Sequence, residues 1–126
     1  MHFDIVTGRF EDLDHAQEKL ALVASDRDLS WSQLKQEVER LSEILAALTL
    51  PKGHPIIVYG HKRASMVVAM LACIASDHPY IPVDTVVPME RVKRILAMTK
   101  AQVVLNCTGE ELVLDVPLVV AEGLVE

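Results

Sequence analysis

The chain has 126 residues, 51% of them hydrophobic, and carries 12 Lys and Arg residues against 18 Asp and Glu, a formal net charge of −6. This size and apolar content indicate a globular domain or part of one, which excludes a disordered tail. The basic residues are scattered along the sequence. No nucleic-acid partner is therefore expected, since such binding uses a clustered basic surface.

The most apolar stretch, "ASMVVAMLACIAS" from Ala64 to Ser76, contains no charge. It is shorter than the roughly 20 residues that cross a bilayer, which favours a buried core helix. The acidic N-terminal stretch "MHFDIVTGRFEDLD" lacks the apolar core of a signal peptide. We therefore expect no membrane insertion and a cytoplasmic location.

The first predicted elements are a strand at Leu20–Ser25, a turn at 26–28 and an extended segment from Leu29. A helix follows, because Ser30 and Gln33 have the spacing of a capping box. Apolar residues then recur at spacings of four and three and predict one buried face: Leu34, Val38, Leu41, Leu45 and Leu48. Pro51 and Gly53 predict the end of this helix.

The second half alternates apolar strands with helices. Strands are predicted at Pro55–Gly60 and at "YIPV", where Pro82 indicates a sheet edge or a strand end. Pro88 opens another helix, whose inner stripe is Val92, Ile95, Leu96 and Thr99. The stretches "AQVVLN" and "VPLVVA" predict two more strands. The expected fold class is α/β, a layered, mostly parallel sheet flanked by helices.

Motifs that carry chemistry are scarce. The five glycines are too far apart for a phosphate-binding loop, and the five histidines lack metal-ligand spacing. The two cysteines are far apart, and Cys73 is expected to pack as a small hydrophobe. Tyr80 and Trp31 are expected to be core or half-buried anchors.

Three polar residues are candidates for catalytic groups. Asp84 could be a phosphate acceptor or magnesium ligand, but a turn-capping carboxylate is favoured, because no acidic pair ends the preceding strand. His61 could be a general base, but no residue nearby in the sequence would orient it. Ser65 lacks a nucleophile elbow and is expected in the first turn of a helix. The sequence therefore predicts no catalytic, substrate-binding, cofactor-binding or metal-binding residue.

Several motifs resemble those of one enzyme superfamily. "LSWSQL" (Leu29 to Leu34) looks like the first core motif of adenylate-forming enzymes, and "LACIASDHPYIPVD" (Leu71 to Asp84) is similar to the second. "PMERVKRIL" resembles the helix that follows. "IIVYGHK" and "HPYIPVD" are similar to the D-alanine–D-alanyl carrier protein ligases within the superfamily. The usual Lys-Ala-Gly is replaced by Ala75-Ser76-Asp77, where the glycine position suits a left-handed backbone.

The resemblance implies that residues 1–126 are the N-terminal portion of an AMP-binding domain, ending before its phosphate-binding loop. The full enzyme would use ATP and magnesium to activate D-alanine as an adenylate. It would then transfer D-alanine to the phosphopantetheine thiol of a D-alanyl carrier protein, for cell-envelope polymers. The fragment alone would be inactive, hold no cofactor and self-associate through uncovered apolar surface.

Two alternatives remain open. One is an adenylation domain of a peptide synthetase or another acyl-adenylate ligase. The other is a naturally short, non-catalytic binding or assembly module that keeps the fold.

Overall fold

The computed structural model describes residues 2–4, 9–11, 20–110, 112, 114 and 118–121. Its elements in chain order are β1 (His2–Asp4), β2 (Arg9–Glu11), β3 (Leu20–Val23), β4 (Asp28–Ser30), α1 (Trp31–Ala47), β5 (Ile56–Tyr59), α2 (Ala64–Ala75), β6 (Tyr80–Val83), α3 (Met89–Thr99), β7 (Val103–Asn106) and β8 (Leu118–Ala121).

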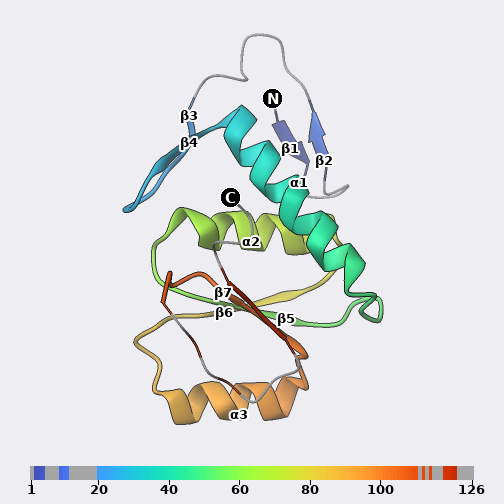
Figure 1. Cartoon of the computed structure of the whole chain (residues 1–126), viewed down its shortest axis with the longest axis vertical. Helices are drawn as coiled ribbons and strands as arrows, with labels where there is room; N and C mark the ends of the chain where they lie inside the picture. The colour runs from blue at the N-terminus through green and yellow to red at the C-terminus, as the bar shows by residue number, and fades with distance from the viewer. Residues whose placement is uncertain are drawn as a thin grey trace.

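The centre of the fold is a four-stranded sheet with the order β6-β5-β7-β8, and every neighbouring pair in it is parallel. From β5 the chain passes through α2 to β6 on one side. It then returns through α3 to β7 on the other side of β5. Because crossovers of this kind are right-handed, the two opposite directions place α2 and α3 on opposite faces of the sheet, as Figure 1 shows.

The alternation of side chains along β5 serves both faces at once. Ile56 and Val58 belong to the core cluster beneath α2, whereas Ile57 and Tyr59 belong to the cluster beneath α3. This is the period of two that a strand imposes, and each of the four positions is buried. A continuous apolar run therefore suits a strand that is covered on both faces.

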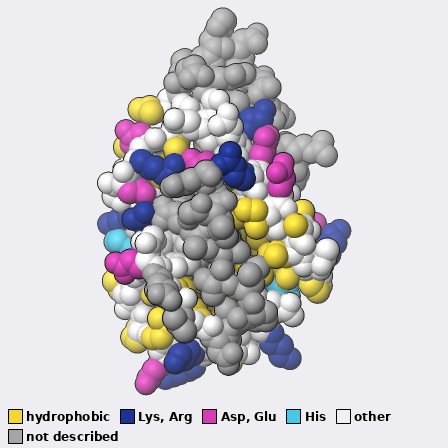
Figure 2. All heavy atoms as spheres, viewed as in Figure 1, with side chains coloured by type: hydrophobic (Ala, Val, Ile, Leu, Met, Phe, Trp, Pro, Cys, Tyr) yellow, Lys and Arg dark blue, Asp and Glu magenta, His cyan; other side chains and the backbone are white. Residues whose placement is uncertain are grey.

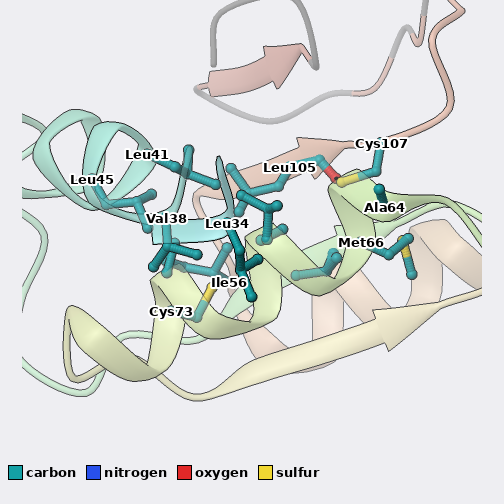
Figure 3. Packing of buried hydrophobic residues seen from close by; sticks show 14 of the residues in the cluster. Leu34, Val38, Leu41, Leu45, Ile56, Ala64, Met66, Cys73, Leu105 and Cys107 are labelled. Carbon is teal, nitrogen blue, oxygen red and sulfur yellow. Dashed lines mark hydrogen bonds between the residues drawn. The ribbon is translucent and has the colours of Figure 1, made fainter. Parts of the chain in front are cut away.

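Helix α1 begins with the predicted capping box. The Gln33 backbone N–H donates to Ser30 Oγ at 3.2 Å, and the Ser30 N–H donates to Gln33 Oε1 at 2.8 Å. Four of the predicted stripe residues are buried and point toward α2 in Figure 3: Leu34, Val38, Leu41 and Leu45. Each such side chain contributes roughly 1.5–3 kcal/mol before entropy is subtracted.

Helix α2 lies between α1 and the sheet (Figure 1), and this explains why its sequence is apolar nearly all round. Its buried residues are Ala64, Ser65, Met66, Val68, Ala69, Ala72 and Cys73. Small residues alternate with larger ones, which lets a helix pack closely on two sides. The predicted inner layer is confirmed.

The remaining predicted helices and strands that fall on described residues agree with the structure, apart from details at some of their ends. The sheet is parallel, and β6, which carries Pro82, is at its edge among the described strands. Pro88 is the N-cap of α3 rather than its first residue. The strand near Leu20 pairs antiparallel with β4 in a separate hairpin, and the β1–β2 pair was not predicted. Residues 116 and 117 of the last predicted strand lie outside the described residues.

The residue after the C-cap of α2 has the left-handed backbone expected there. Asp77 has a φ of +63°, and its carboxylate is 3.8 Å from Lys52 Nζ, with both side chains mostly exposed. Such an exposed pair contributes little to stability, so the strained backbone dominates at this position.

Replacing Asp77 with Gly should therefore stabilise the domain by up to about 1 kcal/mol, since glycine adopts this conformation without strain. Urea unfolding measures the change as a shift of the midpoint, provided that the dependence of the unfolding free energy on urea concentration stays the same. Gly53→Ala is the matched opposite: Gly53 has a φ of +75° with open space around it, and alanine should destabilise by a similar amount. A lower midpoint for the Asp77→Gly variant would show that the Asp77 side chain has a stabilising role.

Candidate functional site

The order of the strands identifies one edge of the sheet as the candidate site. The chain leaves β5 toward one side and enters β7 on the other, so a topological switch point lies between these two strands. Ligands of open α/β sheets bind outside the carboxyl ends of the strands at such a point. Here these ends carry His61 after β5, Asp84 after β6 and Thr108 after β7.

A hollow of about 630 Å³ opens at this edge. Its residues come from the ends of three strands, from the β3–β4 turn and from the start of α3, and most of them are polar. They are Ser25, Asp26, Tyr59, His61, Arg63, Thr85, Met89, Thr108, Glu110 and Leu112. Segments far apart in the sequence thus meet around one concave surface.

His61 and Asp84 form a pair across the ends of β5 and β6. His61 Nδ1 is 2.7 Å from Asp84 Oδ2, and the two side chains are 47% and 41% exposed. No residue close to His61 in the sequence was expected to orient it, and the fold supplies such a residue from a distant part of the chain. Asp84, 23 residues away, is in place to fix the ring and leave Nε2 for other contacts.

The second role of Asp84 is the predicted one. Its Oδ1 accepts a hydrogen bond from the Val86 backbone N–H at 3.0 Å, which caps the turn that leads into α3. The pKa of the Asp84 carboxyl lies below its usual range, first because of this backbone donor and next because of His61. Asp84 therefore favours the fold as an anion, and that contribution is lost as the pH falls through its lowered pKa.

Asp26 joins the β3–β4 turn to the start of α2. The Ala64 backbone N–H donates to Asp26 Oδ1 at 2.9 Å, so this carboxylate caps a helix 38 residues away. Arg63 Nη2 lies 3.8 Å from Asp26 Oδ2. Ser25 Oγ donates to the Lys62 carbonyl at the same junction.

Opposing effects act on the Asp26 carboxyl. Burial alone would raise its pKa. The backbone N–H groups of Ala64 and Asp26, together with the charges of Arg63 and Arg27, outweigh burial and leave the pKa below its usual value. The charged form of Asp26 is therefore the one that the fold stabilises.

The third wall of the hollow is a self-bonded turn after β7. Asn106 is buried, and its Oδ1 accepts from the Thr108 N–H at 3.1 Å and from Thr108 Oγ1 at 2.6 Å. Asn106 Nδ2 donates to the Glu110 carbonyl at 2.7 Å. The polar groups of this wall thus already bond one another.

Behind the hollow, β5, α2 and β7 pack closely around Gly60. A Cβ placed on Gly60 would meet Met66 Sδ at 2.7 Å and the Cys107 carbonyl oxygen at 3.1 Å, so this glycine serves close packing. Ser65 is buried in the first turn of α2, as predicted, with Oγ 3.4 Å from the same carbonyl. Its hydroxyl therefore packs against the backbone and has no base beside it.

Cys73 is also structural. It is fully buried among α1, α2 and β5 (Figure 3), and burial raises the pKa of its thiol to about 12. The thiol is therefore neutral and inert at ordinary pH. The prediction that Cys73 packs as a hydrophobe is confirmed. Tyr80 and Trp31 are half-buried against the same cluster, as expected.

Two further histidines meet at the opposite edge of the sheet. His78 Nδ1 is 2.9 Å from the His54 carbonyl, and the Gln102 N–H donates to His54 Nε2 at 3.1 Å. Both rings thus bond backbone groups. Within the described residues no group of three His, Cys, Asp or Glu side chains could hold a metal ion.

The described lining of the hollow does not by itself fit the phosphates of ATP. Its two basic side chains each face a carboxylate, His61 with Asp84 and Arg63 with Asp26, and Glu110 adds a further acidic residue. A triphosphate needs backbone N–H groups from a flexible loop together with uncompensated cations. The basic side chains of the hollow are therefore already paired with its own carboxylates.

These features define an open, parallel α/β domain whose ligand-binding edge lies at the carboxyl ends of β5 and β7. Residues 10–123 match the family model described as AMP-binding enzyme. The chain belongs to the AMP-binding enzyme family of adenylate-forming ligases, and the resemblance found in its motifs is confirmed.

The relatives that the chain matches in sequence include D-alanine–D-alanyl carrier protein ligases. The chain is 39% identical over 92 residues to the D-alanine–D-alanyl carrier protein ligase of Bacillus licheniformis, covering 73% of this chain and 18% of that protein. It is 33% identical over 101 residues to the Bacillus cereus enzyme of the same name, covering 80% and 20%. The chain thus spans about a fifth of the relatives it matches.

Solved structures agree on the fold. The nonribosomal peptide synthetase FmoA3 in its AMPPNP-bound form superposes with a TM-score of 0.78 at 25% identity, covering 88% of this chain and 12% of that one. The N-terminal subdomain of Klebsiella oxytoca NpsA, in complex with 3-hydroxybenzoyl-AMSN, gives 0.71 at 17%, covering 87% and 28%. No helix among the described residues is long and apolar enough to cross a membrane.

Removing the carboxylate that caps α2 should destabilise the domain. Asp26→Ala should lower the free energy of unfolding by about 1 kcal/mol at pH 7, because the Ala64 N–H loses its acceptor. Asp26→Asn keeps an acceptor and is the matched control, with a smaller loss. Urea unfolding should show the alanine deficit shrinking as the pH falls through the Asp26 pKa. A deficit that persists unchanged in acid would contradict the role of the charge.

The Asp84 carboxyl should titrate below its usual range in carbon-detected NMR. In the His61→Ala variant its pKa should rise but stay below the usual value, because the Val86 N–H still donates. Thr85→Val is the control, since the Thr85 hydroxyl lowers the Asp84 pKa less than the Val86 N–H and His61 do, and its loss should matter less. An unchanged Asp84 pKa in His61→Ala would show that the pair does not form in solution.

Proposed function

We propose that this chain is the N-terminal part of the AMP-binding domain of a D-alanine–D-alanyl carrier protein ligase. The observation that carries the proposal is the 39% identity to the Bacillus licheniformis ligase over 92 residues. The strings "IIVYGHK" and "HPYIPVD", which suggested this subfamily, contain the whole of β5 and the whole of β6 with residues of the turns beside them. They therefore include both members of the His61–Asp84 pair.

The complete enzyme would condense D-alanine with ATP to an aminoacyl-adenylate, releasing pyrophosphate. It would then pass the D-alanyl group to the phosphopantetheine thiol of a D-alanyl carrier protein, with release of AMP. ATP, magnesium and a cytoplasmic location belong to this proposal, as does a role in D-alanylation of cell-envelope polymers.

In the complete enzyme, this chain would support the sheet and position the loops at its carboxyl edge. The buried α2 layer fixes β5 and β7, and the hydrogen-bonded turns after β5, β6 and β7 shape the edge against which the rest of the enzyme would pack. Catalytic groups for attack on a phosphate would come from outside residues 1–126. The isolated chain would therefore be inactive, and apolar surface left uncovered would favour its self-association.

An adenylation domain of a peptide synthetase is the second candidate. The observation that favours it is the FmoA3 superposition, with a TM-score of 0.78. Its sequence identity, 25%, is lower than that to the D-alanine ligases, so we place it second.

Amino-acid-dependent exchange of pyrophosphate into ATP tests the proposal. An enzyme that contains this chain should catalyse the exchange with D-alanine in preference to L-alanine and to larger amino acids. The 126-residue chain alone should show no exchange, because the part of it that the structure describes offers no cationic phosphate cradle.

The outcomes are distinct. Preference for an L-amino acid would move the assignment to the peptide-synthetase class. Exchange by the isolated chain would overturn the claim that the catalytic groups lie outside it. L-Alanine serves as the matched control, because it differs from D-alanine only in configuration.

A further inference from the structure

Helix α3 has one face that the fold leaves uncovered. Val92 is fully buried against the sheet, and Ile95 and Leu96 pack beside it. The opposite face is exposed along the length of the helix and consists mainly of basic side chains at helical spacing. Its residues are Arg91, Lys93, Arg94, Ala97, Met98 and Lys100.

The charge on this face contrasts with that of the chain. Residues 89–100 contain four of the 12 basic residues and only one of the 18 acidic ones, Glu90. Basic residues that look scattered in the sequence therefore gather on one surface once α3 forms. Figure 2 shows Lys and Arg side chains at the end of the molecule where Figure 1 places α3.

Glu90 lies one helical turn from Lys93 and Arg94, but no ion pair among the described residues involves the basic side chains of this face. No carboxylate among the described residues lies within 4.0 Å of the side-chain nitrogens of Arg91, Lys93, Arg94 or Lys100. Mutual repulsion among close cations disfavours this arrangement unless an external anion compensates it. The face therefore carries a net positive charge that a negatively charged partner would compensate.

The same face belongs to an outer layer of the enzyme. Helix α2 is apolar nearly all round and is covered on both sides, as an inner layer requires. Helix α3 is strongly amphipathic, and burying four unpaired cations under another layer of the enzyme would cost several kcal/mol for each ion. The basic face is therefore expected to stay in contact with solvent in the complete protein.

We propose that the basic face of α3 is the docking surface for the carrier protein, which contacts it through an acidic surface of its own. This inference rests on the proposed function. Two observations favour a protein over a nucleic acid. The helix has 11 residues, about 16 Å, which is short for tracking a nucleic-acid backbone. Met98, 83% exposed, supplies an apolar contact within the basic surface, as protein interfaces use.

The position of α3 suits delivery of a substrate arm. Met89, the first residue of the helix, lines the hollow at the carboxyl edge of the sheet, and Thr85 precedes it on the same wall. The basic face begins two residues later at Arg91. A partner seated on α3 would therefore lie beside the edge where ligands of this fold class bind.

The test is a double charge reversal, Arg91→Glu with Arg94→Glu, in the full-length ligase. In D-alanyl transfer, the KM for the carrier protein should rise about tenfold or more, with kcat little changed, because surface charges mainly govern encounter. D-Alanine-dependent pyrophosphate exchange should keep the wild-type rate, because it does not use the carrier. The salt dependence of the KM should also flatten.

Both substitutions are tolerable for folding, since the side chains are exposed and Glu at position 91 favours the helix dipole. Wild-type exchange activity of the variant verifies this. Lys52→Glu is the matched control, an exposed basic residue in the turn after α1, and its KM for the carrier should be unchanged.

An unchanged carrier KM in the double variant, with exchange intact, would overturn the docking proposal and leave the proposed function standing. An equal rise of the KM in Lys52→Glu would overturn it as well, because net charge rather than α3 would then be responsible. Absence of D-alanine-dependent exchange in the wild-type ligase would instead refute the proposed function.

Discussion

The structure depends on the burial of α2 between α1 and the parallel sheet. A helix that is apolar nearly all round has no stable position at the surface, so two layers must cover it. The stripe of α1 supplies one cover, and the alternating residues of β5 and β7 supply the other. This packing fixes the positions of β5 and β7 relative to α2.

The candidate site follows from that packing rather than from a motif. Gly60 lets the end of β5 lie close to Met66 and Cys107, and His61 follows at the edge of the sheet. Asp84 and Asp26 then use their carboxylates to hold two loops, one at the end of β6 and one at the start of α2. Both carboxyl groups have lowered pKa values because they accept hydrogen bonds as anions. The edge is thus pre-formed by groups that satisfy one another.

Most of the fold could be predicted from local pattern, because its elements obey simple periods. The capping box at Ser30, the stripe from Leu34 to Leu45 and the continuous run of β5 each have one good structural solution. The site could not be predicted in the same way. His61 and Asp84, or Asp26 and Ala64, are brought together by crossovers, and no spacing in the sequence records that contact. The β1–β2 pair could not be predicted because each strand is only three residues long, too short for an alternating pattern to stand out.

The basic face of α3 was likewise not evident from the sequence alone. Arg91, Lys93 and Arg94 look dispersed among apolar residues until the period of the helix separates them from Val92 and Ile95. Charge patterning therefore becomes informative only after each charged residue is assigned to a face. The family relationship explains the scaffold, whereas the exposed surface carries the features that can differ between members.

The most direct test of this account is thiol labelling of Cys73 across a urea series. The experiment uses the Cys107→Ala variant, in which Cys73 is the one remaining cysteine of the chain. Cys73 is fully buried in the layer that the fold depends on. Its labelling should require the whole free energy of unfolding, so the rate should follow global unfolding with the same dependence on urea. Rapid labelling without denaturant, or a much weaker dependence on urea, would show that α2 opens locally and would contradict its place as the inner layer.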